Sequence, residues 1–181
     1  MLNKRILVKS VTNLSEARYC AGMFVDFISF ELNENNPYFI PKKNFDEIRG
    51  WLSGVKILGS FEGGDAEQIN EKIKEYDLDG FILAEDQSDL LAAVQVPLII
   101  QEYSKSPLPY LPQDSILLWT GEGLPTERTS SEILLGFDFK RVTENDSSAD
   151  GYAFLGSFEK QVGENSYDEL MEALEYIEEN Y

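Results

Sequence analysis

Eight short apolar runs recur along the chain, separated by more polar segments. Each run is nearly continuous in apolar residues, which is typical of strands covered on both faces, as in a parallel sheet. We therefore expect strands over residues 6–8, 27–30, 55–61, 80–83, 97–100, 115–119, 133–135 and 151–155.

Apolar residues at helical spacing fill most of the gaps between these runs. Residues 44–52, for example, place Phe45, Ile48 and Leu52 on one stripe, as an amphipathic helix does. The same reasoning predicts a helix over residues 15–23, with Ser15 as a candidate N-cap. Further helices are expected over residues 65–76, 87–94 and 167–177.

The second half of the chain is abbreviated. Three prolines fall within residues 105–113, where a fifth helix would lie, and proline at this density blocks a helix. Residues 121–131 and 140–150 are expected to form loops, or at most single turns. Strands alternating with helices fit either a (β/α)8 barrel or an open doubly wound sheet, and periodicity alone does not distinguish them. We expect one domain over residues 1–181.

Incomplete helical cover should expose apolar surface on this side of the molecule, at Leu108, Tyr110 and Leu111. Exposed apolar patches often mark self-association. The sequence therefore predicts a homodimer through the abbreviated side.

Charge restricts the classes of partner. The chain has 33 acidic and 15 basic side chains, a formal net charge of −18. Such a field repels nucleic acid and anionic membrane surfaces, so we expect neither as a partner. No run approaches the ~18 apolar residues of a membrane helix, and no signal-peptide core follows the first five residues. With one cysteine, Cys20, no internal disulfide can form, and we expect a cytoplasmic protein with a buried structural thiol.

Histidine is absent from the chain. Its absence excludes Ser-His and Cys-His nucleophile pairs and removes the commonest nitrogen ligand of metals. No compact spacing of carboxylates suggests a metal site, and neither a P-loop nor a G-x-G-x-x-G sequence is present. We expect no metal and no cofactor.

Residues 5–30 resemble the first βα unit of phosphoribosylanthranilate isomerase, whose family pattern there reads roughly K-I-C-G-I-T-N-L and then G-A-D-x-x-G-F. The match runs without gaps through Thr12, Asn13, Leu14, Ala17, Asp26 and Phe30. Residues 36–40, 55–61 and 78–86 follow in the same order as further family motifs, and the resemblance continues more weakly over 97–180. It implies a (β/α)8 barrel rather than an open sheet. In the second half of this barrel we expect helices to be shortened or missing. It also implies descent from an enzyme of tryptophan biosynthesis that catalyses an Amadori aldose–ketose isomerisation.

The residues that carry the family's chemistry are replaced. The catalytic cysteine aligns with Lys9, the general-acid aspartate with Trp119, and an arginine with Tyr38. An ammonium is not a base and an indole does not donate a useful proton, so this chain is expected to be catalytically inactive or strongly altered. The alternative is a divergent active isomerase, or a lyase that uses Lys9 as a Schiff-base nucleophile on a small phosphorylated sugar derivative.

The family's phosphate-binding segments are partly kept, and the mouth is rich in polar and aromatic groups. Gly136, Gly156 and Ser157 resemble the phosphate-binding positions after the last two strands, or they are simply loop residues. A small phosphorylated or planar ligand is therefore expected. The side chains expected to line the mouth are Tyr38, Glu85, Tyr103 and Trp119, with Lys9 pairing with Glu31, Glu62, Glu85 or Glu102.

Overall fold

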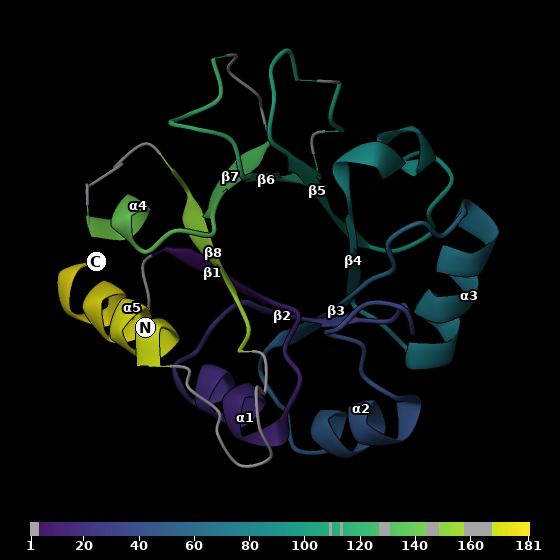
Figure 1. The fold of residues 1–181 in the computed structure, drawn as a ribbon, viewed down its shortest axis with the longest axis horizontal. Helices are drawn as coiled ribbons and strands as arrows, with labels where there is room; N and C mark the ends of the chain where they lie inside the picture. The colour runs from purple at the N-terminus through teal and green to yellow at the C-terminus, as the bar shows by residue number, and fades with distance from the viewer. Residues whose placement is uncertain (1–3, 109, 113, 127–130, 144–148, 158–167) are drawn as a thin grey trace.

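A computed structural model of the protein describes residues 4–108, 110–112, 114–126, 131–143, 149–157 and 168–181. Eight parallel strands form a closed barrel (Figure 1). The strands are β1 (Arg5–Lys9), β2 (Phe27–Glu31), β3 (Lys56–Ser60), β4 (Gly80–Leu83), β5 (Leu98–Tyr103), β6 (Ile116–Trp119), β7 (Glu132–Gly136) and β8 (Gly151–Leu155).

The barrel is closed by the pairing of the last strand with the first. Each strand pairs with its neighbour in sequence, and β8 pairs with β1 from Arg5↔Gly151 to Lys9↔Leu155. The prediction of a (β/α)8 barrel is therefore confirmed, and the open doubly wound sheet is excluded.

Side chains alternate between the barrel interior and its outer face. One apolar cluster fills the interior; its buried members are Leu7, Phe27, Leu58, Ile82, Ile100, Ile116, Leu118, Leu134 and Ala153. The intervening residues belong to a larger cluster between the strands and the outer layer. Because the period of a strand is two, this alternation decides which side chains at the strand ends face the interior.

Helices cover the first half of the barrel much as predicted. Within the described residues they are α1 (Leu14–Gly22), α2 (Lys42–Arg49), α3 (Ala66–Tyr76), α4 (Lys140–Thr143), α5 (Asp168–Asn180) and a 3₁₀ helix, η1 (Glu85–Leu90). Asn13, not Ser15, caps α1, because the Asn13 side chain accepts the Glu16 N–H at 2.9 Å. None of these helices is long and apolar enough to span a bilayer.

The expected helix over residues 87–94 is wrong in type and extent. A 3₁₀ helix spans Glu85–Leu90 instead. The Gln87 side chain explains the difference: its amide donates to the carbonyls of Phe61 and Gly64, at 2.9 and 3.0 Å. These bonds hold the segment close to the β3–α3 connection, where a short, tight turn fits.

The outer layer is incomplete in the second half, as predicted. Among the described residues of the connections that follow β5 and β6, Figure 1 shows no helix, and α4 is a single turn. The expected exposure of the proline-rich segment is only partly right. Tyr110 is 87% exposed, but Leu108 is half-buried and Leu111 is 7% exposed, because both pack against the outer faces of the strands.

Candidate functional site

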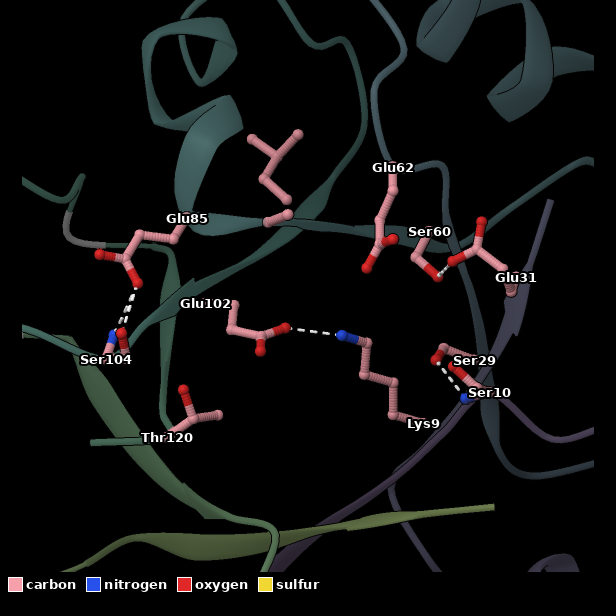
Figure 2. Close-up of polar contacts among 12 residues, drawn as sticks. Lys9, Ser10, Ser29, Glu31, Ser60, Glu62, Glu85, Glu102, Ser104 and Thr120 are labelled. Atoms are coloured by element: carbon pink, nitrogen blue, oxygen red, sulfur yellow. Dashed lines mark hydrogen bonds and ion pairs between the residues drawn. The ribbon is translucent and has the colours of Figure 1, made fainter. Parts of the chain in front are cut away.

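An ion pair spans the mouth of the barrel, the end at which the strands finish. Lys9 at the end of β1 and Glu102 on β5 face each other from opposite sides, with 2.6 Å between Lys9 Nζ and Glu102 Oε2 (Figure 2). Their side chains are only 13% and 20% exposed. Of the four carboxylates expected as partners of Lys9, Glu102 is the one that makes the ion pair. Glu85 instead accepts the N–H and the hydroxyl of Ser104, at 3.1 and 2.6 Å.

A second carboxylate, Glu31, lies almost fully buried beside this pair. Its two oxygens accept the Ser60 hydroxyl at 2.7 Å and the Asn33 N–H at 2.9 Å. Burial raises the pKa of Glu31, and repulsion by Glu62 adds to the rise; the two hydrogen bonds and the charge of Lys9 oppose it. The mouth therefore holds more carboxylates than cations.

Trp119 does not line the mouth, which corrects the expectation from sequence. It is 4% exposed and belongs to the outer apolar cluster, and its Nε1 donates to the Gly123 carbonyl at 3.0 Å. Tyr103 pairs with Trp119 in register and also packs on the outer side. Since Ile116 and Leu118 face the interior, the next inward position is Thr120, and Figure 2 shows Thr120 on the mouth side, near Glu102.

Tyr38 lies half-buried between β2 and α2, where its N–H donates to the Asn36 side chain at 2.9 Å. The side chains of Asn33 and Asn36 form hydrogen bonds at the same edge of the mouth. Asn33 donates to the backbone carbonyl of Glu62 at 2.8 Å, and Asn36 donates to the Glu62 carboxylate at 3.4 Å. These bonds hold Glu62 next to Glu31.

The backbone amides after β8 are already hydrogen-bonded within the chain. The Gly156 N–H donates to the Lys9 carbonyl, and the Ser157 N–H donates to Glu16 Oε1, both at 2.6 Å. A Cβ at position 156 would lie 2.7 Å from the Ser10 carbonyl oxygen, so glycine there is explained by close backbone packing. Gly136 faces the interior, where a Cβ would lie 3.2 Å from Leu118 Cδ1.

Glu16 was not singled out from the sequence, although a signal exists. An Asn N-cap followed three residues later by Glu is the pattern of a capping box. Here Glu16 instead reaches across to Ser157, 141 positions away, and this long-range partner has no signature in the sequence.

Cys20 is fully buried, as expected, and burial raises the pKa of its thiol. Within the described ranges, no three His, Cys, Asp or Glu side chains are grouped so that they could hold a metal ion.

Several solved structures of isomerases share this barrel. Phosphoribosyl anthranilate isomerase from Thermus thermophilus has a TM-score of 0.76 and 17% identity, with 98% of this chain and 100% of that chain covered. The fold is that of phosphoribosylanthranilate isomerase. A monomeric form of the dimeric isomerase from Thermotoga maritima has a TM-score of 0.74 and 15% identity, with 98% of this chain and 100% of that chain covered. An isomerase in complex with reduced 1-(o-carboxyphenylamino)-1-deoxyribulose 5-phosphate has a TM-score of 0.73 and 15% identity, with 97% of this chain and 99% of that chain covered.

No family model and no curated protein matches the sequence. The likeness to the isomerases therefore lies in the fold, and it covers essentially the whole of both chains.

Proposed function

We propose that this protein is a phosphoribosylanthranilate isomerase-like barrel that no longer catalyses the isomerisation and serves as a binding protein. The Lys9–Glu102 ion pair is the observation that carries the proposal. Lys9 aligns with the position at which the isomerases carry their catalytic cysteine, and it faces the mouth from the end of β1.

An Amadori rearrangement needs a base to remove the C2 proton and an acid to open the sugar ring. General acids and bases work only within hydrogen-bonding reach of the proton that they move. Lys9 is held in an ion pair with the Glu102 carboxylate at 2.6 Å, and a lysine ammonium has no lone pair to accept a proton. Trp119, aligned with the general acid, packs outside the barrel.

The carboxyl groups of the mouth and the backbone amides that are already hydrogen-bonded within the chain also disfavour a phosphorylated substrate. Glu62 brings a further carboxylate to the ion pair, next to the buried carboxyl group of Glu31, and Ser157 gives its N–H to Glu16. A phosphate dianion entering this mouth meets carboxylates where isomerase-type barrels commonly offer backbone N–H groups. The ligand that fits is accordingly small and neutral or cationic, with a planar group allowed.

The proposal extends to location and assembly. We place the protein in the cytoplasm, since its single cysteine is buried and reduced. We also propose a homodimer through the side that lacks helices; the isomerase of Thermotoga maritima is itself dimeric. Light scattering at high concentration tests this assembly, and a monodisperse monomer contradicts it.

Complementation of a tryptophan auxotroph that lacks the isomerase tests the loss of turnover. We expect no growth from this protein when immunoblotting shows soluble expression equal to that of an active isomerase. Growth that disappears with Lys9→Met overturns the proposal in favour of a divergent enzyme. Borohydride trapping of a carbonyl adduct on Lys9 overturns it in favour of a Lys9-dependent lyase.

A further inference from the structure

Two aromatic residues are exposed at the end of the barrel opposite the mouth. Phe24 lies between α1 and β2, Trp51 lies between α2 and β3, and the two residues are 72% and 63% exposed. Because β2 pairs with β3 and α1 packs beside α2, these two connections are neighbours (Figure 1). The half-buried Met23, Leu52 and Val55 add apolar area to the same connections.

The fold gains little from the side chain of Phe24. This residue is the second after α1, and its φ of 59° lies in the left-handed region, which a bulky residue rarely adopts. The bond that closes the helix end is made by the backbone, since the Phe24 N–H donates to the Ala21 carbonyl at 3.2 Å. A glycine would make this bond without the strain. A strained backbone that holds an aromatic ring in solvent is typical of a functional surface.

Arg18 connects the two helices at this end of the barrel. It belongs to α1, and its guanidinium lies 5.4 Å from the centre of the Trp51 ring. Within the described residues no carboxylate forms an ion pair with Arg18, although the chain has 33 acidic side chains. An arginine held over a tryptophan ring keeps N–H donors available for a carboxylate. Tryptophan and arginine are also among the residues that most often dominate contacts between proteins.

The local charge here differs from that of the whole chain. Arg18 is the exposed charge of α1, the connection after α2 has no charged side chain, and the exposed Lys56 follows it. Asp26 is engaged in an ion pair with Arg5, which leaves Glu47 on α2 as the nearby acid. Salt at physiological strength screens charges beyond about 8 Å, so a docking segment responds to these local groups more than to the net charge of −18.

We infer that Arg18, Phe24 and Trp51, with the apolar residues around them, form a docking surface for a partner protein, which we name the α1–α2 face. The partner presents an acidic segment that also carries apolar side chains: a carboxylate pairs with Arg18, and the apolar groups cover the two aromatic rings. A protein segment fits better than nucleic acid or an anionic membrane, which the net charge repels at longer range. The surface lies away from the mouth, so the inference goes beyond the proposed function and does not depend on it.

The probe is a short synthetic peptide with leucine at helical spacing and glutamate at the other positions. The same peptide with lysine in place of glutamate is its control. The chain has two tryptophans, so the two indole N–H signals in a ¹H–¹⁵N spectrum report binding: Trp51 lies in the α1–α2 face, and the buried Trp119 is the internal reference. We expect a saturable shift of the Trp51 signal with the acidic peptide and none with the lysine peptide.

Three variants separate docking from folding. Phe24→Gly removes the ring and relieves the left-handed backbone, so it should weaken peptide binding about tenfold or more while Tm stays close to that of the unmodified protein. Arg18→Glu should lose the acidic peptide and bind the lysine peptide instead. Tyr110→Ser is the matched control, because Tyr110 is a more exposed aromatic on the side of the barrel that lacks helices, and it should bind the acidic peptide normally.

A Trp51 signal that ignores the acidic peptide overturns the inference, as does a shift that Phe24→Gly leaves unchanged. A Trp51 shift that depends on protein concentration without peptide overturns it in favour of a contact between copies of this chain. A shift produced by vesicles of phosphatidylglycerol and phosphatidylcholine overturns it in favour of a membrane contact. Complementation and borohydride trapping report on the mouth alone, so the proposed function and this inference fail separately.

Discussion

Lys9 Nζ lies 2.6 Å from Glu102 Oε2 and so links β1 to β5 across the interior of the barrel. These two strands are the first and fifth of eight, and they share no backbone hydrogen bonds. The ion pair is thus a direct polar link between opposite walls, at the end where catalytic groups of such barrels are usually found.

Removing one member of this pair should cost more than removing both. Lys9→Met leaves the Glu102 carboxylate largely buried without its partner, and we expect a loss of about 3 kcal/mol in the free energy of unfolding. Lys9→Met with Glu102→Leu should recover most of this loss, since no charge is left unpaired. Urea unfolding of the two single variants and the double variant measures the coupling. Additive losses would show that the pair contributes nothing.

Restoring an aspartate at position 119 should not restore chemistry. Trp119 is 4% exposed in the outer cluster, so Trp119→Asp buries a charge among apolar side chains. We expect a loss of at least about 3 kcal/mol in stability from the lost packing and the unpaired charge. Lys9→Cys with Trp119→Asp should therefore fail to complement the auxotroph.

Thr120→Asp is the matched control, because position 120 faces the mouth beside Glu102. This carboxylate lies beside Glu102 and meets its charge, but it remains in contact with solvent and should cost less stability than Trp119→Asp. If Trp119→Asp is as stable as Thr120→Asp by thermal unfolding, the outward orientation of residue 119 is wrong.

The stability of the protein should fall as pH rises above the ordinary glutamate pKa of 4.5. Burial raises the pKa of Glu31, so above 4.5 the folded state holds a proton that the unfolded state has already lost. The free energy of unfolding falls with rising pH wherever the folded state binds more protons than the unfolded state. For Glu31 this range lies between pH 4.5 and its raised pKa. Glu31→Gln keeps the shape: its amide oxygen can accept the Asn33 N–H, and its amide N–H can donate to the Ser60 hydroxyl. This variant should flatten the slope.

Glu62→Gln provides the comparison for that experiment. It removes the neighbouring charge that raises the pKa of Glu31, so the titration of the Glu31 carboxyl in a ¹³C spectrum should shift to lower pH. A slope unchanged by Glu31→Gln would assign the pH dependence to other groups, of which Glu16 has a shift of the same sign.

Gly156→Ala should destabilise the barrel by about 2 kcal/mol or more, because the added Cβ meets backbone rather than a movable side chain. The closest atoms are the Ser10 carbonyl oxygen at 2.7 Å and Val11 Cα at 3.0 Å. Gly22→Ala is the control: a Cβ at Gly22 meets nothing within 4 Å, and alanine favours the helix. Equal stability of the two variants in urea unfolding would contradict the packing role of Gly156.

The sequence predicted the strands well because each is an apolar run of the length that a covered parallel strand needs. It predicted the loss of outer helices for an equally local reason, the prolines of residues 105–113. It failed at Trp119, where an aligned motif gave the position along the chain but not the face of the strand. A shift of one residue in a strand moves a side chain to the opposite face.

The sequence also did not predict which distant segments contact one another. Lys9 was predicted to pair with a carboxylate, but four glutamates were equally suitable in sequence, and only the closed barrel brings Glu102 opposite it. The bond from Ser157 to Glu16 depends on the same closure, which brings β8 beside β1. Local pattern specifies the elements, whereas the identity of such partners depends on the register of all eight strands.

The uneven outer layer should give the two halves of the barrel different rates of amide hydrogen exchange. Amide protons on β1 to β4 lie beneath α1, α2 and α3, while no helix of the described residues covers β5 and β6. Opening free energies follow such differences in cover. Deuterium should therefore enter β5 and β6 well before β2 and β3, and proteolysis under native conditions should begin on that same flank.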